Sequence, residues 1–433
     1  KLSIPLQNDK PQPIIKPLPT QRSVHIEYWS IYRFFISPKS LKILIMLAVF
    51  LHCDTAAKHI HIDRYVCPGG RMSNTEHQKI AQIVGSYVDE YTGLPLSKTQ
   101  SLGAIEVNDD SATIEIILGY PAASVVDAMA EAISAQVIAE SSISSATVNI
   151  SSHIQSRARS SKIASLDPVK NIIAIASGKG GVGKSATALN VALALHLEGA
   201  KVGLLDADIY GPSQPLMLGV PSDRRPEVQD QKYFIPIEAY GLQTMSMGYL
   251  VTDKTPMVWR GPMVSGALTQ MVNQTLWQDL DYLIIDMPPG TGDIQLTLSQ
   301  QVPVTGAAVV TTPQDIALLD AKKGIEMFRK VNVPCLGIIE NMSTHVCSEC
   351  GHNEAIFGDG GGERIADEYD VPLLGKLPLA LEIRKGLDEG KPLVAVNPDS
   401  LLAAQYRHIA RKLAAQLCIP DANTEAMRAG PKI

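Results

Sequence analysis

Short apolar runs alternate with helix-length stretches over the second half of the chain. Strands are predicted at residues 172–176, 202–205, 282–285, 307–310 and 336–339. Such almost wholly apolar runs are typical of parallel strands that are buried on both faces. A helix is expected between the first two runs, over residues 186–198, and Gly199 ends it. This alternation predicts an α/β fold, with a doubly wound and mostly parallel sheet.

The first part of the chain shows a different pattern. Apolar side chains recur at helical spacing over residues 76–91, and residues 124–140 predict a second helix. Three strands are expected, at residues 105–107, 113–118 and 146–150. The mixture of few helices and few strands predicts a small α+β domain.

The chain changes character near Met72. Residues 1–71 hold an aromatic cluster and an apolar run that is too short to span a membrane, which takes about 20 residues. Because the chain begins with a lysine, we interpret 1–71 as a doubtful leader outside the native protein, with a membrane-targeting leader as the alternative. The domains expected are the leader at 1–71, the small α+β domain at 72–155, a serine-rich linker at 156–167 and the α/β domain at 168–433.

Composition narrows the class of protein. The 433 residues are 45% hydrophobic, which is enough for substantial cores. The net charge of -6 argues against a general nucleic-acid binder, and we expect no stable membrane span. Six cysteines in a chain of this length do not make a disulfide framework. We therefore expect a reduced, cytoplasmic setting.

A glycine-rich loop lies between the predicted strand 172–176 and the predicted helix 186–198. Residues 178–185, Gly-Lys-Gly-Gly-Val-Gly-Lys-Ser, fit the phosphate-binding pattern G-x-x-x-x-G-K-[ST]. Its backbone amides and the helix start favour negative charge, so the loop predicts a nucleotide site. Lys184 is expected to reach the β- and γ-phosphates, and Ser185 to bind Mg²⁺. Nucleotide contacts are expected from Gly178, Gly180, Gly181, Val182, Gly183, Lys184, Ser185 and Thr187.

Acidic residues follow two of the other predicted strands. Asp206 and Asp208 come directly after residues 202–205, and Asp286 follows residues 282–285. Ligands gather at the carboxyl ends of parallel strands, where carboxylates can hold Mg²⁺ or orient an attacking water. For any one of these residues a capping or turn role is the alternative, but together they favour a site that hydrolyses its nucleotide.

Lys179 is a second lysine that the ordinary loop does not need, and it suggests a nucleotide held between two subunits. With it, the loop resembles that of the MinD/ParA class of dimeric NTPases. Residues 277–293, with Trp-Gln-Asp-Leu-Asp-Tyr-Leu-Ile-Ile-Asp-Met-Pro-Pro-Gly-Thr-Gly-Asp, are similar to a motif of the Mrp/ApbC family, as are 258–263 and 340–343. Proteins of that family carry iron–sulfur clusters and hydrolyse ATP. The resemblance covers about residues 168–395.

The resemblance also implies roles for single residues. Lys179 would reach the phosphates of the facing subunit, and Asp208 would position the hydrolytic water. Asn341 would recognise adenine, although an ordinary turn after a strand is the alternative for it. The catalytic residues expected are Lys179, Lys184 and Asp208, and the magnesium ligands are Ser185, Asp206 and Asp286.

Cys347 and Cys350 form the one close cysteine pair, in the sequence His-Val-Cys-Ser-Glu-Cys-Gly-His. A [4Fe–4S] cluster or a tetrahedral zinc ion usually takes four ligands, so two chains that contribute two cysteines each would complete a site. A zinc site with the flanking histidines, a redox-active dithiol and a structural pair stay open. The family resemblance favours a cluster.

These observations predict a homodimeric, slowly hydrolysing ATPase that carries a [4Fe–4S] cluster and passes it to iron–sulfur apoproteins. A spatial-positioning ATPase of the MinD/ParA kind is one alternative, and the amphipathic residues 401–417 would be its membrane contact unless they pack on the domain. A zinc-stabilised ATPase adaptor is the other. The small domain resembles the iron–sulfur cluster assembly type, which suggests docking to cluster assembly factors; because residues 73–155 hold no cysteine, a cluster-binding role for it is in doubt.

Overall fold

The computed structural model of the protein describes residues 73–157, 166–250, 261–347 and 349–420. The expected leader, most of the linker and residues 258–260 of the family motif lie outside the described residues. By their contacts, all described residues belong to one unit, Gly69–Ile433. None of the helices in the described ranges is long and apolar enough to cross a membrane.

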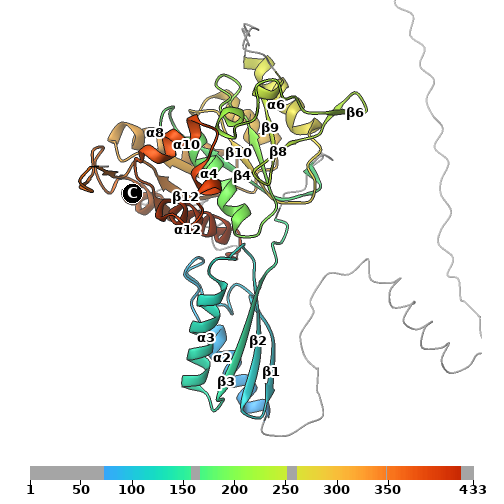
Figure 1. Ribbon diagram of the computed structural model, residues 1–433, viewed down its shortest axis with the longest axis vertical. Coiled ribbons are helices and arrows are strands. Elements are labelled where there is room, and N and C mark those ends of the chain that lie inside the picture. The colour runs from blue at the N-terminus through green and yellow to red at the C-terminus, as the bar shows by residue number, and fades with distance from the viewer. Residues whose placement is uncertain (1–72, 158–165, 251–260, 348, 421–433) are drawn as a thin grey trace, which may run out of the picture. The chain divides into compact units, whose positions relative to one another are not determined.

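An eight-stranded sheet forms the larger part of the structure (Figure 1), in the order β15-β12-β11-β4-β10-β5-β9-β8. Its strands are β4 (Val169–Ala176), β5 (Val202–Asp206), β8 (Ile237–Ala239), β9 (Leu242–Ser246), β10 (Leu280–Asp286), β11 (Gly306–Thr311), β12 (Cys335–Glu340) and β15 (Leu373–Lys376). Neighbouring strands are parallel, except that β8 is antiparallel to β9. The predicted fold class is confirmed, and all five strands predicted in this part of the chain lie within observed ones.

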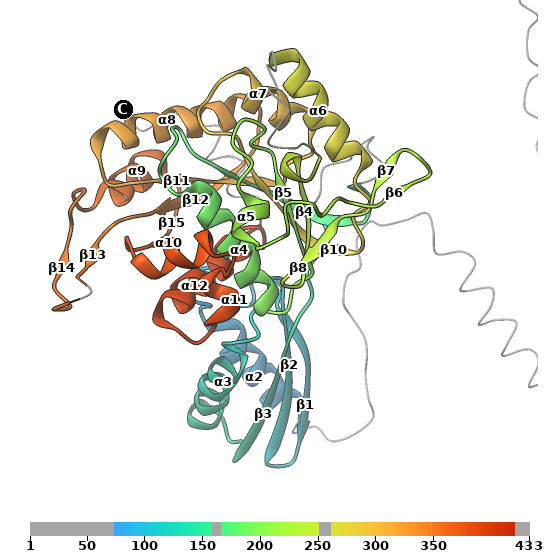
Figure 2. The ribbon, with the colours of Figure 1, turned by 45° about the horizontal axis from the view of Figure 1, so that its top comes forward.

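Helices cover both faces of this sheet (Figure 2). They are α4 (Lys184–Leu197), α5 (Gln214–Met217), α6 (Gly261–Gln274), α7 (Asp293–Gln301), α8 (Asp315–Lys330), α9 (Gly361–Tyr369), α10 (Leu381–Asp388), α11 (Leu393–Val396) and α12 (Leu401–Gln416), with the 3₁₀ turn η2 (Met247–Tyr249). Two short hairpins complete this part: β6 (Val228–Gln229) with β7 (Tyr233–Phe234), and β13 (His345–Val346) with β14 (Asn353–Glu354).

Alternation along the strands explains the two layers of helices. Along β4, Ile173 and Ile175 belong to the core shared with α4 and α12, whereas Ile172 and Ala174 belong to the core shared with α6, α7 and α8. Successive strand side chains point to opposite faces, so an apolar strand needs a helix on each side. The amphipathic helix α12 buries its apolar face in the first of these cores, which confirms that residues 401–417 pack on the domain.

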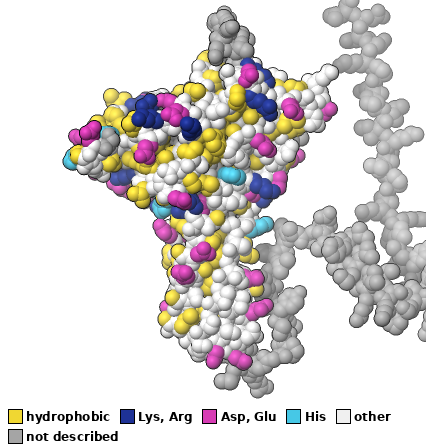
Figure 3. Space-filling model, in the orientation of Figure 1, with side chains coloured by type: hydrophobic (Ala, Val, Ile, Leu, Met, Phe, Trp, Pro, Cys, Tyr) yellow, Lys and Arg dark blue, Asp and Glu magenta, His cyan; other side chains and the backbone are white. Residues whose placement is uncertain are grey.

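The small domain has a three-stranded sheet with two helices. Its elements are α2 (Ser73–Ser86), β1 (Leu102–Asn108), β2 (Ser111–Leu118), α3 (Val126–Glu140) and β3 (Ser145–Ser152). Strand β1 is antiparallel to β2, and β3 is parallel to β2. In Figure 3 acidic side chains are spread over the visible face of this domain.

The helix predicted at residues 76–91 ends five residues early, at Ser86. The cause is Asp89, whose carboxylate accepts hydrogen bonds from the Tyr91 amide (3.0 Å), the Thr92 hydroxyl (2.9 Å) and the Tyr120 hydroxyl (2.8 Å). Aspartate side chains that bind nearby backbone groups stabilise turns at the expense of helix. The apolar spacing alone did not reveal this turn.

Glu198, just after the last residue of α4, joins the small domain to the larger one. Its carboxylate is 2% exposed and accepts hydrogen bonds from Ser124 (2.9 Å from the amide, 2.6 Å from the hydroxyl) and from Arg407 (2.8 Å). Arg411 binds the same carboxylate, and its guanidinium lies over the ring of Tyr91. The helix that begins at the glycine-rich loop therefore ends at a buried ion-pair network under the small domain.

Candidate nucleotide site and cysteine hairpin

The glycine-rich loop connects β4 to α4, as the sequence predicts. Gly181 and Gly183 take left-handed backbone conformations, with φ of 83° and 80°, which residues other than glycine seldom adopt. At Gly178 the constraint is space, because a Cβ there would come closer than 3.0 Å to the backbone of Asp320 in α8. The conformation of the loop thus depends on its glycines, which allow the positive φ angles, and on α8, which packs against Gly178.

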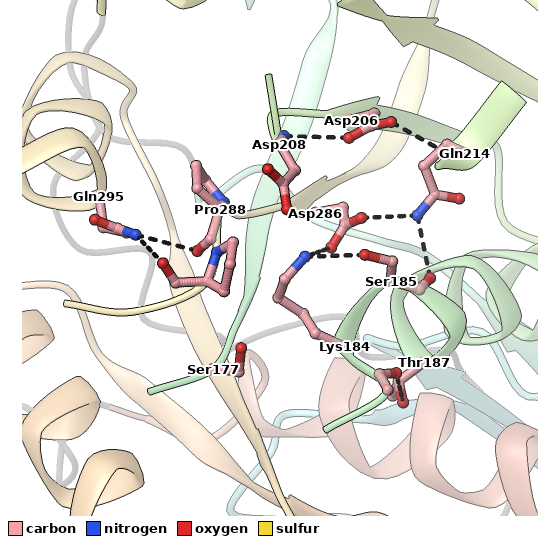
Figure 4. Close-up of polar contacts among 12 residues, drawn as sticks. Ser177, Lys184, Ser185, Thr187, Asp206, Asp208, Gln214, Asp286, Pro288 and Gln295 are labelled. Carbon is pink, nitrogen blue, oxygen red and sulfur yellow. Dashed lines mark hydrogen bonds and ion pairs between the residues drawn. The ribbon is translucent and has the colours of Figure 1, made fainter. Parts of the chain in front are cut away.

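Lys184, at the start of α4, is 6% exposed and forms an ion pair with Asp286 at the end of β10 (Figure 4). Its ammonium also donates to the Ser185 hydroxyl (3.0 Å). Gln214 donates through its side-chain amide to Asp286 (2.9 Å) and to the Ser185 carbonyl (3.1 Å). The loop lysine, the loop serine and the carboxylate at the end of β10 therefore form one hydrogen-bonded cluster.

Two more aspartates lie beside this cluster. Asp206 is fully buried and accepts hydrogen bonds from the Asp208 amide (3.1 Å), the Gln214 amide (3.2 Å) and the Ser246 hydroxyl (2.9 Å). Burial, and then the neighbouring Asp286, raise the pKa of Asp206. Asp208 points toward the pair of Lys184 and Asp286 (Figure 4), and burial raises the pKa of its carboxyl.

The charge in this cluster suits a divalent cation. Asp206 and Asp286 are both 0% exposed, and Lys184 is the buried cation that the described residues place between them and the loop. Two buried carboxylates and a serine hydroxyl are oxygen donors of the kind that Mg²⁺ prefers, and a single lysine does not balance them. Ser185, Asp206 and Asp286 therefore fit the ion predicted for them.

A pocket of about 240 Å³ opens over the loop. Its lining residues are Ser177, Lys179, Gly180, Gly181, Gly183, Lys184, Ser185, Ala186, Asp208 and Pro289. Most of the predicted nucleotide and catalytic residues are therefore brought together. A larger cavity of about 660 Å³ lies where the small domain meets β10 and the end of α12, and no residue of the loop lines it. We take the smaller pocket as the candidate nucleotide site because the glycine-rich loop and both of its lysines line it.

Two predicted residues lie behind the loop rather than in the pocket. The hydroxyl of Thr187 donates to the Gly183 carbonyl (2.9 Å) within α4. The side-chain amide of Asn341, which is 7% exposed, donates to the Val182 carbonyl (2.9 Å). Both residues support the loop from the protein side, and their contact with a nucleotide stays a prediction.

Cys347 and Cys350 lie at the end of the hairpin formed by β13 and β14. The Cys347 amide donates to the His352 carbonyl and the Gly351 amide donates to the Cys347 carbonyl, both at 2.9 Å. Cys350 is exposed and Cys347 half-buried, and neither forms a disulfide within the described part of the chain. The backbone amides of Cys350 and Glu349 hold the pKa of the Cys347 thiol below its usual value. A thiol with a lowered pKa more readily gives the thiolate that binds metal.

The structure adds two glutamines that the sequence did not single out. Gln214 contacts the carboxylates, and Gln295 donates to the carbonyls of Pro288 (3.4 Å) and Pro289 beside the pocket. A polar residue directly before a proline was the only mark of Gln214 in the sequence, and that mark is common in loops. Their roles come from long-range contacts that no local pattern carries.

A parallel sheet with this loop after β4, and with buried aspartates at the ends of β5 and β10, defines a P-loop NTPase. A family model described as NUBPL iron-transfer P-loop NTPase matches residues 168–414, and one described as iron-sulfur cluster assembly protein matches residues 77–150. The chain belongs to this family of NUBPL-type P-loop NTPases. The resemblance stated from the loop and the motif at residues 277–293 is thereby confirmed.

Several relatives match over most of their length. A Pseudomonas fragi protein named iron-sulfur cluster carrier protein is 62% identical over 268 residues, which are 62% of this chain and 93% of that one. The Escherichia coli K12 protein of the same name is 53% identical over 74% of this chain and 87% of its own. The mouse iron-sulfur cluster transfer protein NUBPL is 49% identical over 58% and 79%.

Among solved structures, the chain is similar to a nucleotide-binding protein from Archaeoglobus fulgidus in complex with ADP. The two are 34% identical over 53% of this chain and 89% of that one, with a TM-score of 0.47.

Proposed function

We propose that this protein is an ATP-dependent iron–sulfur cluster carrier that holds a cluster between two copies of the chain and passes it to apoproteins. The observation that carries the proposal is that one chain of this family has both the loop cluster around Lys184 and Asp286 and a cysteine pair on a hairpin, in which Cys350 is exposed and the pKa of Cys347 is lowered. Relatives that match over most of their length bear the names of cluster carrier and cluster transfer proteins.

ATP would bind with its phosphates on the loop, at residues 178–185. Its phosphates compete with Asp286 for Lys184, since an ammonium that now pairs with a carboxylate can pair with a phosphate instead. Ser185, Asp206 and Asp286 would hold Mg²⁺, which neutralises the phosphate charge. Asp208, which lines the pocket, would position the attacking water. Hydrolysis is expected to be slow, because in such proteins it serves as a switch.

The cysteine pair and the surface beside the loop both favour a homodimer. Two thiols do not complete the four ligands of a [4Fe–4S] cluster, whereas a symmetric pair of hairpins supplies four. In addition, large apolar side chains are exposed near the loop: Ile316 (71%) and Leu319 (59%) lie on the first turns of α8, the helix whose Asp320 backbone packs against Gly178. Exposed apolar side chains clustered beside a functional pocket are typical of an interface. Lys179, on the rim of the same pocket, would contact the facing subunit's nucleotide.

A short segment connects the two sites. Asn341 contacts the loop at Val182, and the cysteine hairpin begins four residues later at His345. The segment between them is fastened to the body of the domain, where the Leu379 amide donates to the Thr344 carbonyl (2.7 Å). A change in the loop on ATP binding or hydrolysis would reach the hairpin through Asn341. This is how the proposal joins hydrolysis to the holding or release of a cluster.

The remaining parts of the proposal concern partners and setting. The small domain would dock cluster assembly factors or apoproteins, and its network at Glu198 fixes it to the end of α4. Reduced thiols are maintained in the cytoplasm, which is where we place the carrier. A spatial-positioning ATPase is the less favoured function, since α12 buries the apolar face that would bind a membrane. A zinc-stabilised ATPase adaptor, the other alternative, would hold zinc at the cysteine pair and carry no cluster.

Cluster transfer to an apoprotein, followed after anaerobic reconstitution, tests the proposal. The wild type should transfer its cluster, and the Cys347→Ser and Cys350→Ser variants should not. Cys418→Ser is the matched control, because this cysteine lies at the end of α12 and away from the hairpin. If the variant that carries both Cys347→Ser and Cys350→Ser transferred the cluster at the wild-type rate, the carrier function would be refuted. Zinc without iron in the anaerobically purified protein would favour the adaptor.

A further inference from the structure

Gln214 is the first residue of α5, and its position is unusual for an amide side chain. It is 1% exposed, and it contacts all three residues that fit the magnesium ion. Its backbone amide donates to Asp206 (3.2 Å), and its side-chain amide donates to Asp286 (2.9 Å) and to the carbonyl of Ser185 (3.1 Å). One residue therefore connects strands β5 and β10 with the glycine-rich loop (Figure 4).

The orientation of this side chain is fixed by its neighbours. Both groups that face its nitrogen, the Asp286 carboxylate and the Ser185 carbonyl, are acceptors, so exchanging the amide nitrogen and oxygen would set acceptor against acceptor. The amide oxygen is buried and has no hydrogen-bond partner among the described residues. An unpaired buried oxygen costs stability, and an apolar side chain at this position would not incur that cost. The two hydrogen bonds that the amide nitrogen donates, to Asp286 and to Ser185, offset the cost of the unpaired oxygen.

The surroundings of Asp286 would change when a nucleotide binds. One of its carboxylate oxygens pairs with Lys184, and the other accepts the hydrogen bond from Gln214. In the proposed function, the Lys184 ammonium pairs with the phosphates when ATP binds, and its ion pair with Asp286 is then lost. Gln214 is not among the residues that line the pocket, so its bond to Asp286 need not be given up when phosphates enter. After the ammonium has moved, Gln214 is the side chain that still orients the Asp286 carboxylate.

We propose that Gln214 is a positioning residue that orients the Asp286 carboxylate for the nucleotide's magnesium ion. The proposal rests on the nucleotide part of the function proposed above. It predicts that Gln214 contributes to binding only when the divalent cation is present, because the phosphates themselves contact the loop and Lys184. Loss of the amide should therefore separate magnesium-dependent from magnesium-independent affinity.

The test compares the affinity for a non-hydrolysable ATP analogue in Mg²⁺ and in EDTA, measured by calorimetry on the full chain. In Gln214→Met the ratio of the two affinities should fall about tenfold, the size of one hydrogen bond to a charged group, while the affinity in EDTA stays near the wild-type value. A general loosening of the site would instead lower both affinities together and leave the ratio unchanged.

Gln295→Met is the matched control. Gln295 is also buried beside the pocket, but it donates to the backbone carbonyls of Pro288 and Pro289 and to no carboxylate. Its ratio should equal that of the wild type. An unchanged ratio in folded Gln214→Met, or an equal fall in both variants, overturns the proposal for Gln214.

A second variant covers a failure of Gln214→Met to fold, which circular dichroism would show. Gln214→Asn keeps an amide but is one methylene shorter, so its amide cannot reach Asp286 and Ser185 at the same time. The same fall in the affinity ratio is expected. A wild-type ratio in this variant also counts against the proposal. If the wild type itself bound the analogue equally well in Mg²⁺ and EDTA, the magnesium site of the proposed function would fail, and that result is distinct from a failure of Gln214 alone.

Discussion

Replacing Gly178 with alanine is expected to destabilise the nucleotide-free protein through a single contact between the loop and α8. The added methyl carbon would lie closer than 3.0 Å to three backbone atoms, the carbonyl carbon and oxygen of Asp320 and the amide nitrogen of Ala321. These atoms belong to a helix and cannot rotate away as a side chain would. Either α8 or the loop must move.

The size of the effect follows from this geometry. Overpacking usually costs about 1–3 kcal/mol, and a clash with helix backbone belongs at the upper end, about 3 kcal/mol. In a domain of 150–250 residues, each kcal/mol lowers Tm by about 2–4 °C, so Gly178→Ala should lower Tm by about 6–12 °C. Because the displaced loop carries Lys184, nucleotide affinity should fall as well.

Gly180→Ala is the control, since it makes the same chemical change two residues away. A Cβ at Gly180 would meet no atom within 4 Å, and the residue is not among those with positive φ. Its Tm should stay within about 3 °C of the wild type, as expected for a glycine replaced without strain. Scanning calorimetry without nucleotide gives both values. Equal Tm shifts in the two variants would show that the packing of Gly178 against α8 does not shape the loop.

Three further predictions concern buried polar groups. Lys184→Met should lower the free energy of unfolding by about 3 kcal/mol in urea titrations without nucleotide, because it leaves Asp286 buried without its cation; an unchanged value would mean that the ion pair is absent in solution. Burial raises the pKa of Glu198, but its hydrogen bonds outweigh this and the pKa is lowered overall, so its contribution is present above pH ~4.3 and is lost as the pH falls through its folded pKa. Glu198→Gln should therefore lower the free energy of unfolding by about 2 kcal/mol at pH 7 and by less in acid. A loss of stability that does not depend on pH would show that the bonds to the Glu198 carboxylate do not stabilise the fold. Tyr120→Phe removes the hydrogen bond to Asp89 and should cost about 1–2 kcal/mol by the same titration, against no change if that turn is held by other contacts.

Apolar runs and a motif sufficed to predict the centre of the structure. Residues 172–176 and 282–285 are so uniformly apolar that only burial on both faces accommodates them, and their pairing as β4 and β10 carries the loop and Asp286 to one edge. The short edge strands β8 and β15 went unpredicted, because three or four residues give no measurable period. The turn at Asp89 that follows the early end of α2 is completed by one hydrogen bond from Tyr120, thirty-one residues away, which no local pattern reveals.

In the site, too, some residues could be predicted from local sequence patterns and others could not. Lys184, Ser185 and Asp286 were found because spacing along the chain and strand ends mark them, and the structure places them together. Gln214 was missed, because its role depends on where α5 packs and not on its neighbours in sequence. For Asn341 the sequence indicated a position near the nucleotide, but the bond to Val182 that ties it to the loop became visible only in three dimensions.

The iron content per chain shows whether two copies of this protein share one cluster. After anaerobic reconstitution and removal of unbound iron, we expect about two iron atoms per chain in a dimer, from one [4Fe–4S] cluster held by four cysteines of two chains. The Cys347→Ser and Cys350→Ser double variant should retain none and be monomeric in the same conditions without nucleotide. A wild-type chain that binds four iron atoms as a monomer, or a double variant that keeps its cluster, would show that Cys347 and Cys350 of two chains do not share a cluster.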